Sequence, residues 1–396
     1  MVLARRGARL GAAAALAIVV VACGGGGGGG SGGVTTGQGM GSVRIALTDA
    51  PACGFDEVNI TVDRVRVHAS STADDSSSGW HDLVLAPARK VNLLDLTNGV
   101  LEELGEMALP GGQYTQLRLV LRPDSGGVLA NSVVPTGGTE QPLDTPSATQ
   151  SGLKLIHSFT VPPGGLADVV LDFDACKSIV RRGNGSYGLK PVIAVVPRTV
   201  ADIVGYVDPA IAGMQISAQV GGTVMRATVP DASGAFTLAF LDPSVAPNVA
   251  VVFAAPGFAS AVVSAVPIAL QGTTSLSTAA TPITLPASAT RTASGHALPA
   301  VAAASVRAVQ AVGIVPEVEI ASTNADATGA YSLTLPTAPA LLAPYAVSLP
   351  LVFAPQPASA AKYTLEAEAD GYVAQSAAID LTAADAAVDF TLPPAP

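Results

Sequence analysis

The sequence predicts an all-β protein in which several β-sandwich domains follow a signal peptide and a glycine-rich tether. Short segments with apolar residues at every second position recur along the chain, and Gly, Pro, Asn and Asp separate them. Only 13% of the residues are charged and 49% are hydrophobic. Beyond the N-terminus no uninterrupted apolar run attains the ~18 residues that a spanning helix needs. The mean hydropathy of +0.47 therefore indicates many short strands rather than membrane helices.

Residues 1–22 have the three parts of an export signal: a basic start, an apolar stretch and a small-residue boundary. The basic residues are Arg5, Arg6 and Arg9, and the apolar stretch is Leu10 to Val21. The boundary Val20-Val21-Ala22-Cys23 resembles the lipobox of bacterial lipoproteins, although Val20 stands where Leu is the commoner residue. The resemblance implies that Cys23 is acylated and becomes the mature N-terminus. The alternative is an ordinary secretory signal that happens to contain a cysteine.

Residues 23–41 form the predicted tether, which begins with Gly24 to Gly30 and continues with Ser31, Gly32 and Gly33. Such a segment is suited to hold a folded domain away from a membrane, and two or more acyl chains on Cys23 would anchor it stably. Gly24 follows the cysteine where Asp is the familiar inner-membrane retention signal. The outer membrane is therefore favoured, and the membrane is the first expected partner.

Cys53 and Cys176 remain once Cys23 is acylated. An even pair of cysteines in an exported chain is most simply a disulfide. Closing so long a loop stabilises a fold by roughly 4–5 kcal/mol in the chain-entropy model. Two buried free thiols are the alternative.

The formal net charge of −10 becomes −13 when the three arginines of the signal are removed. An acidic chain without a basic stripe gains little from counterion release on a phosphate backbone, so nucleic acid is not an expected partner.

The first region, residues 42–198, is predicted to be a β-sandwich. In its second strand the buried parity changes after Val62, which predicts a bulge near Asp63-Arg64. Residues 100–104 are predicted to form a helical turn ended by Gly105, and 125–151 a long mobile loop. The other predicted strands are Val43–Leu47, Val58–Val67, Trp80–Leu85, Val91–Leu96, Thr115–Leu121, Leu153–Val161, Asp168–Phe173 and Tyr187–Val196.

Several motifs of the first region recur in one order: Leu47-Thr48-Asp49-Ala50-Pro51, the strand Val58–Val67, Val91 to Leu96, Gly112 to Leu119, and Leu189 to Ile193. In this order they resemble a bacterial lipoprotein domain of unknown function that is often found after a lipobox. The resemblance implies no enzymatic residues.

The remaining chain contains two diverged copies of one unit: a second region, 199–288, and a third region, 289–396. Asp231-Ala232-Ser233-Gly234-Ala235-Phe236 in the second region corresponds to Asp326-Ala327-Thr328-Gly329-Ala330-Tyr331 in the third. In each, Asp caps a turn and Gly supplies positive φ. The pattern resembles the carboxypeptidase regulatory-like, transthyretin-like β-sandwich, an accessory or binding module, without the zinc peptidase that gives the family its name.

The chain offers little catalytic chemistry. His68, His81, His157 and His296 make no metal-binding or catalytic motif and are interpreted as surface or edge residues. The one G-x-S-x-G match, residues 29–33, lies in the tether, where no strand and helix would hold a nucleophile. We therefore expect no catalytic residue, metal or cofactor.

One acidic constellation depends on the disulfide. A Cys53–Cys176 bond would bring Asp49 near Asp172 and Asp174, which share the outer face of a predicted strand. Three converging carboxylates would suit calcium. The alternative is that Asp49 caps a turn and the other two carboxylates are solvated.

The sequence thus predicts a non-enzymatic, lipid-anchored cell-envelope protein with a role in binding, adhesion or assembly, whose ligand is an unknown envelope protein or a glycan. A carbohydrate-binding accessory lipoprotein is the first alternative. An exposed cluster from Tyr206, Phe236, Phe258, Tyr331 and Tyr372 would favour it, although strand parity places most of these in cores. An extracytoplasmic hydrolase, joining His81 or His157 to Asp172, is the second alternative.

Overall fold

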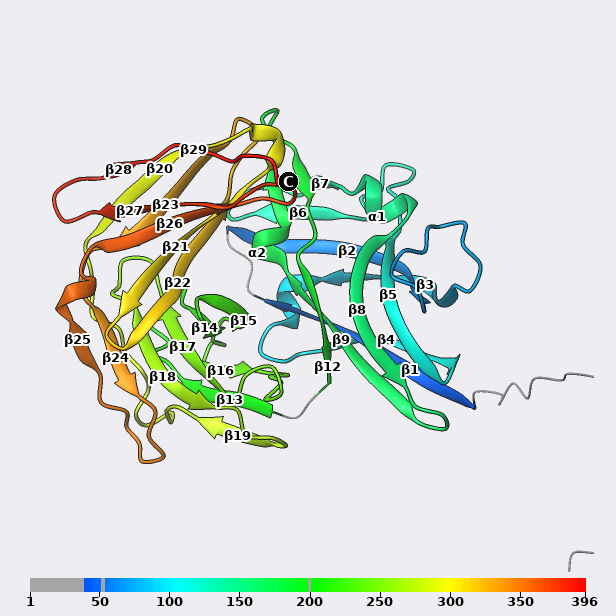
Figure 1. Cartoon of the computed structure of the whole chain (residues 1–396), viewed down its shortest axis with the longest axis horizontal. Coiled ribbons are helices and arrows are strands. Elements are labelled where there is room, and N and C mark those ends of the chain that lie inside the picture. The colour runs from blue at the N-terminus through cyan, green and yellow to red at the C-terminus, as the bar shows by residue number, and fades with distance from the viewer. Residues whose placement is uncertain (1–38, 51–53, 199–200) are drawn as a thin grey trace, which may run out of the picture. The chain divides into compact units, whose positions relative to one another are not determined.

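The computed structural model describes residues 39–50, 54–198 and 201–396, and in these ranges the protein is all-β, as predicted (Figure 1). The described chain forms one compact unit. Among the described residues, no helix has the length and apolar character required to cross a membrane. The helical segments are short: α1 (Pro146–Gln150), α2 (Ala175–Ser178), and the 3-10 turns η1 (Leu93–Leu96), η2 (Ala300–Ala302) and η3 (Pro357–Ser359).

The first region consists of two sheets around one hydrophobic core. The four-stranded sheet has the order β12 (Ile193–Pro197), β9 (Leu166–Asp174), β1 (Met40–Ala50), β4 (Glu102–Pro110). The second sheet has the order β10 (Ile179–Arg181), β11 (Tyr187–Leu189), β7 (Gln141–Asp144), β6 (Ser132–Pro135), β2 (Phe55–His68), β5 (Gly112–Leu121), β8 (Leu153–Val161), and β3 (His81–Asn92) also pairs with β2.

The bulge predicted in β2 is confirmed. The register of β2 shifts between Val62 and Arg64 against both β3 and β5. The extra residue returns Val65 and Val67 to the face that already carries Val58 and Val62, so all four side chains are fully buried in one core.

Residues 100–104 do not form the predicted helical turn. β4 begins at Glu102, and Gly105, with φ of +141°, pairs with Ile45 where the register of β1 and β4 shifts. The glycine permits an irregular strand rather than ending a helix. The predicted strands Trp80–Leu85 and Val91–Leu96 are likewise one strand, β3, followed by η1.

The segment 125–151 is ordered, contrary to the predicted mobile loop, because it carries β6, β7 and α1. The buried Asn131 fixes it: its Oδ1 accepts from Thr61 N at 3.0 Å, and its Nδ2 donates to Arg122 O at 2.7 Å. A side-chain amide that replaces strand hydrogen bonds leaves no periodic pattern in the sequence.

The predicted strand 187–196 is two strands, β11 and β12, in different sheets. Pro191 lies between them and has no N–H to continue a ladder. The chain crosses from one sheet to the other at this point.

The second and third regions have the same strand order, as expected of two copies of one unit. In the second region the small sheet is β16 (Ala235–Leu238), β13 (Ala201–Tyr206), β19 (Gly272–Ser275), and the large sheet begins β15 (Thr223–Thr228), β14 (Gln215–Val220), β17 (Asn248–Ala254), β18 (Ala261–Pro267). In the third region the corresponding sheets are β23 (Ala330–Pro336), β20 (Thr290–Leu298), β28 (Ala386–Ala387), with β29 (Phe390–Thr391) also on β20, and β22 (Val315–Asn324), β21 (Ser305–Val312), β26 (Lys362–Glu368), β27 (Gln375–Asp380).

The repeated turn behaves as its sequence predicts. Asp231 Oδ1 accepts from the N–H groups of Ser233 and Ala235 at 2.8 and 3.0 Å. Asp326 makes the same two bonds, at the same distances, to its own second and fourth following residues. Gly234 and Gly329 have φ of +83° and +84°. The hydroxyl groups of Ser233 and Thr328 donate to the same carboxylate oxygens at 2.7 and 2.6 Å. These hydroxyl bonds and the backbone bonds stabilise the ionised carboxylates and lower the pKa of both aspartates.

Two strands that follow residue 289 extend a sheet of the second region. β24 (Ala340–Pro344) pairs in parallel with β18, and β25 (Ala354–Gln356) pairs with β24 (Figure 1). Val252 and Val262, on the face of this sheet opposite its own core, are buried in the core of the third region. The two regions therefore share both a sheet and a buried apolar surface.

Candidate functional site

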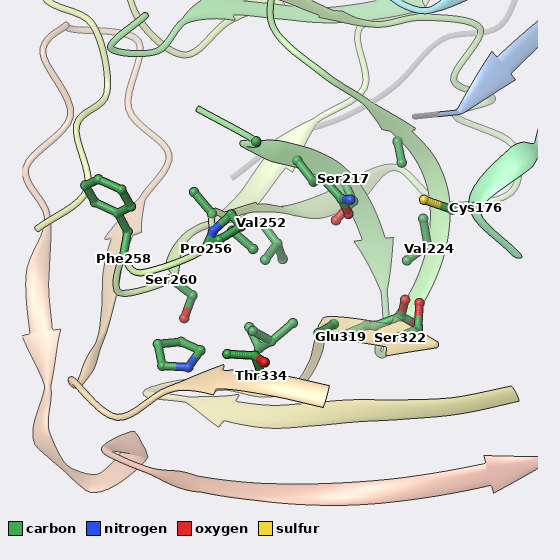
Figure 2. Close-up of a pocket in the computed structure, with 18 of the residues that line it drawn as sticks. Cys176, Ser217, Val224, Val252, Pro256, Phe258, Ser260, Glu319, Ser322 and Thr334 are labelled. Atoms are coloured by element: carbon green, nitrogen blue, oxygen red, sulfur yellow. The ribbon is translucent and has the colours of Figure 1, made fainter. Parts of the chain in front are cut away.

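A cavity of about 240 Å³ lies between the large sheet of the second region and strands β22 and β23 of the third, and α2 of the first region reaches one end of it (Figure 2). The cavity exists because three separately formed sheets meet around it. Phe258 lies at one end and Cys176 at the other.

The walls of the cavity are largely apolar. Val252 of β17 and Ile320 of β22 contribute buried aliphatic side chains, and Pro256, Phe258 and Pro336 contribute rings. Phe258 is half-buried. Pockets for small molecules commonly combine apolar walls with a few polar groups that orient the ligand.

Four hydroxyl groups supply such polar positions: Ser217 on β14, Ser260 before β18, Ser322 on β22 and Thr334 on β23 (Figure 2). Ser217 Oγ accepts from Gln219 Nε2 at 2.8 Å. Within the described ranges, the side-chain hydroxyls of the other three make no hydrogen bond with protein atoms. Ser260 is only 2% exposed. A buried hydroxyl that faces a cavity without a partner is suited to bind a ligand or a water.

The end of the cavity near α2 is charged. Lys177 Nζ lies 3.7 Å from Asp174 Oδ2 and 3.4 Å from Glu319 Oε1. Asp174 Oδ1 also accepts from Lys177 N at 3.0 Å, at the start of α2. Burial raises the pKa of Asp174, and Lys177 partly offsets this effect.

Gln219 joins the second region to the third beside the cavity. Its Nε2 donates to Glu319 O at 2.8 Å, and its Oε1 accepts from Glu319 N at 2.7 Å. Gln219 is 1% exposed. The side chain thus makes the pair of bonds that a neighbouring strand would make.

Asp172 lies where the first region meets the second. Its Oδ2 is 3.3 Å from Arg226 Nη1 of β15, and the side chains are 13% and 11% exposed. Burial raises the pKa of Asp172 to about 6, while Arg226 acts against that shift. Asp172 and Asp174 do share one face of β9, but β15 and α2 contact that face, so it is not the open outer face that the sequence led us to expect.

The three carboxylates of the predicted calcium site have separate partners. Asp49 Oδ1 accepts from Ala175 N at 3.0 Å, Asp172 pairs with Arg226, and Asp174 pairs with Lys177. Asp49 thus bonds the first residue of α2 rather than a turn of its own, and Asp172 and Asp174 are paired rather than solvated, so the arrangement differs from both alternatives. In the described part of the chain, no group of three or more His, Cys, Asp or Glu residues is placed to hold a metal ion.

The histidines lie in unrelated surroundings. His68 Nε2 is 2.9 Å from Ser78 O, and its ring packs on Trp80 with 4.9 Å between centroids. His296 Nδ1 lies 3.3 Å from Asp389 Oδ1 on an exposed surface.

Among the described residues, neither of the two histidines considered for a hydrolase forms an ion pair or hydrogen bond with Asp172. The ring of His81 packs edge-on against Tyr114 at 6.2 Å, and burial lowers the pKa of His157 on β8. The partner of Asp172 in this structure is Arg226.

The aromatic residues considered for sugar binding do not form one exposed cluster. Phe236 and Tyr331 are core residues, 2% and 5% exposed, as strand parity predicted. Tyr206 and Tyr372 are half-buried, and Phe258 lines the cavity.

Cys176, the second residue of α2, also lines the cavity. Cys23 and Cys53 lie outside the described residues, so lipidation and the Cys53–Cys176 pairing stay predictions.

Comparison with known proteins gives a family-model match for part of the first region. Residues 40–191 match the family model described as "Domain of unknown function (DUF4382)", in the part of the chain whose motifs resemble a domain of unknown function. A search of curated proteins found no match.

The chain is also similar to solved structures of bacterial β proteins, at low identity. The Bacillus anthracis TIE protein is 10% identical, with 90% of this chain and 51% of that chain covered and a TM-score of 0.18, so this chain spans about half of its length. The Streptococcal ancillary pilin is 11% identical (89% and 100% covered, TM-score 0.17), and BcpA, the major pilin subunit of Bacillus cereus, is 9% identical (90% and 100%, TM-score 0.16). With TM-scores this low, these likenesses carry no argument about function.

Proposed function

We propose that this protein is a non-enzymatic, lipid-anchored protein of the bacterial cell envelope, with a role in binding, adhesion or assembly. The observation that carries the proposal is the sequence Val20-Val21-Ala22-Cys23 after a basic and apolar signal, followed by a glycine-rich tether and then by folded β regions. A lipidated Cys23 would hold these regions outside the cytoplasm, and Gly24 favours the outer membrane.

In this proposal the first region is a domain of unknown function, and the second and third regions are two carboxypeptidase regulatory-like, transthyretin-like β-sandwiches. Support for two related modules comes from their common strand order and from their shared Asp-capped turn. Such modules bind or support other molecules, in keeping with the cavity at their junction.

A disulfide between Cys53 and Cys176 belongs to the same proposal. β1 and β9 pair in parallel up to Ala50 opposite Asp174. Cys53 follows three residues after Ala50, and Cys176 two residues after Asp174, so the register brings the two approaches to the cysteines side by side. The bond from Ala175 N to Asp49 Oδ1, between the segments that lead to the two cysteines, also supports the proposal.

The test is the intact mass and membrane partition of the full chain, expressed in a bacterium with lipoprotein processing, beside a Cys23→Ser variant. We expect the wild type in the detergent-extracted membrane fraction, with the mass of a chain that starts at Cys23 and carries acyl groups. The Cys23→Ser chain should lack the acyl mass and leave the membrane fraction. An unacylated wild-type chain in the soluble fraction would overturn the proposal.

A further inference from the structure

We infer that the cavity at the junction of the three regions binds one uncharged sugar unit of pyranose size. The inference rests on the proposed binding role but not on the lipid anchor. It differs from sugar binding on an exposed aromatic cluster, because the binding groups line a cavity between two regions and come from both of them.

The volume limits the ligand to a single ring. Pockets for drug-sized molecules have about 300–1,000 Å³, and this cavity has about 240 Å³. An oligosaccharide could therefore enter with one unit only, and a folded partner could not enter.

The polar groups suit a ligand with several hydroxyls. Ser260, Ser322 and Thr334 each offer a hydroxyl with no protein partner among the described residues, and each can donate and accept. They come from the second and third regions, so a ligand between them could be bound from two sides (Figure 2). A purely apolar ligand would leave the buried Ser260 hydroxyl without a partner, which is unfavourable.

The apolar walls suit the other surface of a sugar ring. The C–H groups of a pyranose form an apolar face that packs on aromatic rings, and Phe258 contributes one such ring at one end of the cavity. Hydrophobic walls with few, directed polar groups are typical of small-ligand sites.

The charged end argues for an uncharged ligand. Lys177 lies between Asp174 and Glu319 and within 4 Å of both carboxylates. An anionic ligand would meet the two carboxylates, whereas a cationic ligand would have to displace Lys177 or lie beside it. Carboxylates so neutralised remain good acceptors for the hydroxyl groups of a neutral sugar.

The experiment measures binding to the purified full chain, in a detergent without a sugar head group, by ligand-observed NMR and calorimetry. The probes are glucose, galactose, mannose and N-acetylglucosamine at millimolar concentration, with glucuronate as an anionic and cyclohexylamine as a cationic comparison. We expect at least one neutral sugar to bind, and neither charged probe to compete with it.

Three variants locate the site. Ser260→Ala removes the buried hydroxyl and should weaken binding about tenfold, while Thr334→Trp places a large ring at the exposed Thr334 position of the cavity wall and should block binding. Ser376→Ala removes an exposed hydroxyl on β27 and is the matched control. Circular dichroism and urea midpoints verify that each variant is folded.

The inference is overturned if no neutral sugar binds, if a charged probe binds instead, or if binding persists unchanged in folded Ser260→Ala and Thr334→Trp. Sugar binding is measured on the purified protein, whereas the lipid anchor is tested by the intact mass and by the distribution of the chain between membrane and soluble fractions. Failure of one proposal is thus distinguishable from failure of the other.

Discussion

Replacing Gln219 by Leu should loosen the second region from the third. The amide of Gln219, on the second region, makes two hydrogen bonds to the backbone of Glu319, on the third. The change keeps a side chain of similar size and removes the bonds to Glu319 N and Glu319 O, at 2.7 and 2.8 Å. A buried backbone group that loses its partner costs about 1–3 kcal/mol. For the two groups together we expect a loss of about 2–4 kcal/mol in the free energy of unfolding.

The assay is urea unfolding followed by circular dichroism, with limited proteolysis as a second measurement. Gln141→Leu is the control, since Gln141 is exposed and its amide bonds only to Thr139 two residues away. We expect Gln219→Leu to unfold at lower urea and to be cut faster between the two regions. If it unfolds and is cut like Gln141→Leu, the two bonds of Gln219 do not help to hold these regions together.

Three further predictions concern single residues. The raised pKa of Asp172, about 6 against 3.8, means that the folded state binds its proton more tightly than the unfolded chain does. The contribution of Asp172 to the free energy of unfolding should therefore fall by about 3 kcal/mol as pH rises from about 4 to about 6. Denaturation of the wild type and of Asp172→Asn across pH should differ by this slope. Gly329→Ala should lower the unfolding midpoint more than Gly371→Ala, because both need positive φ but only at Gly329 would the methyl group lie 2.7 Å from a backbone carbonyl oxygen; equal midpoints would contradict the close approach. Reduction should lower the free energy of unfolding of the wild type by roughly 4–5 kcal/mol and should not change that of Cys53→Ser. Cys176 should be alkylated in the wild type only after reduction, and alkylation without reductant would disprove the bond.

Local patterns were sufficient to predict the bulge in β2 and the repeated Asp-capped turn. The bulge in β2 was predictable because the change of parity between Val62 and Val65 occurs within a few residues, and burial of both sets allows one solution. The turn at Asp231 and its copy at Asp326 were also predictable from local sequence, because the capping carboxylate and the glycine are only three residues apart in each.

The candidate site could not be predicted because it depends on how separate sheets pack. The sequence showed that Asp172 and Asp174 share a face of their strand, but not that β15 and α2 contact it. The cavity hydroxyls of Ser260 and Thr334 belong to residue types that are common on any exposed strand, and no motif distinguishes them. Only the packing of the second region against the third places these two hydroxyls around one cavity.

The pairing of β24 with β18 determines how the protein responds to cleavage of its chain. Cleavage of the chain between the second and third regions, near residue 289, would not release the C-terminal part, because β24 would stay bonded within the large sheet of the second region and Val262 would stay buried against the third. A nicked molecule should therefore remain whole until it is denatured. Conversely, a fragment expressed only to residue 288 would expose β18 as an unpaired edge strand flanked by apolar side chains, and such an edge promotes aggregation.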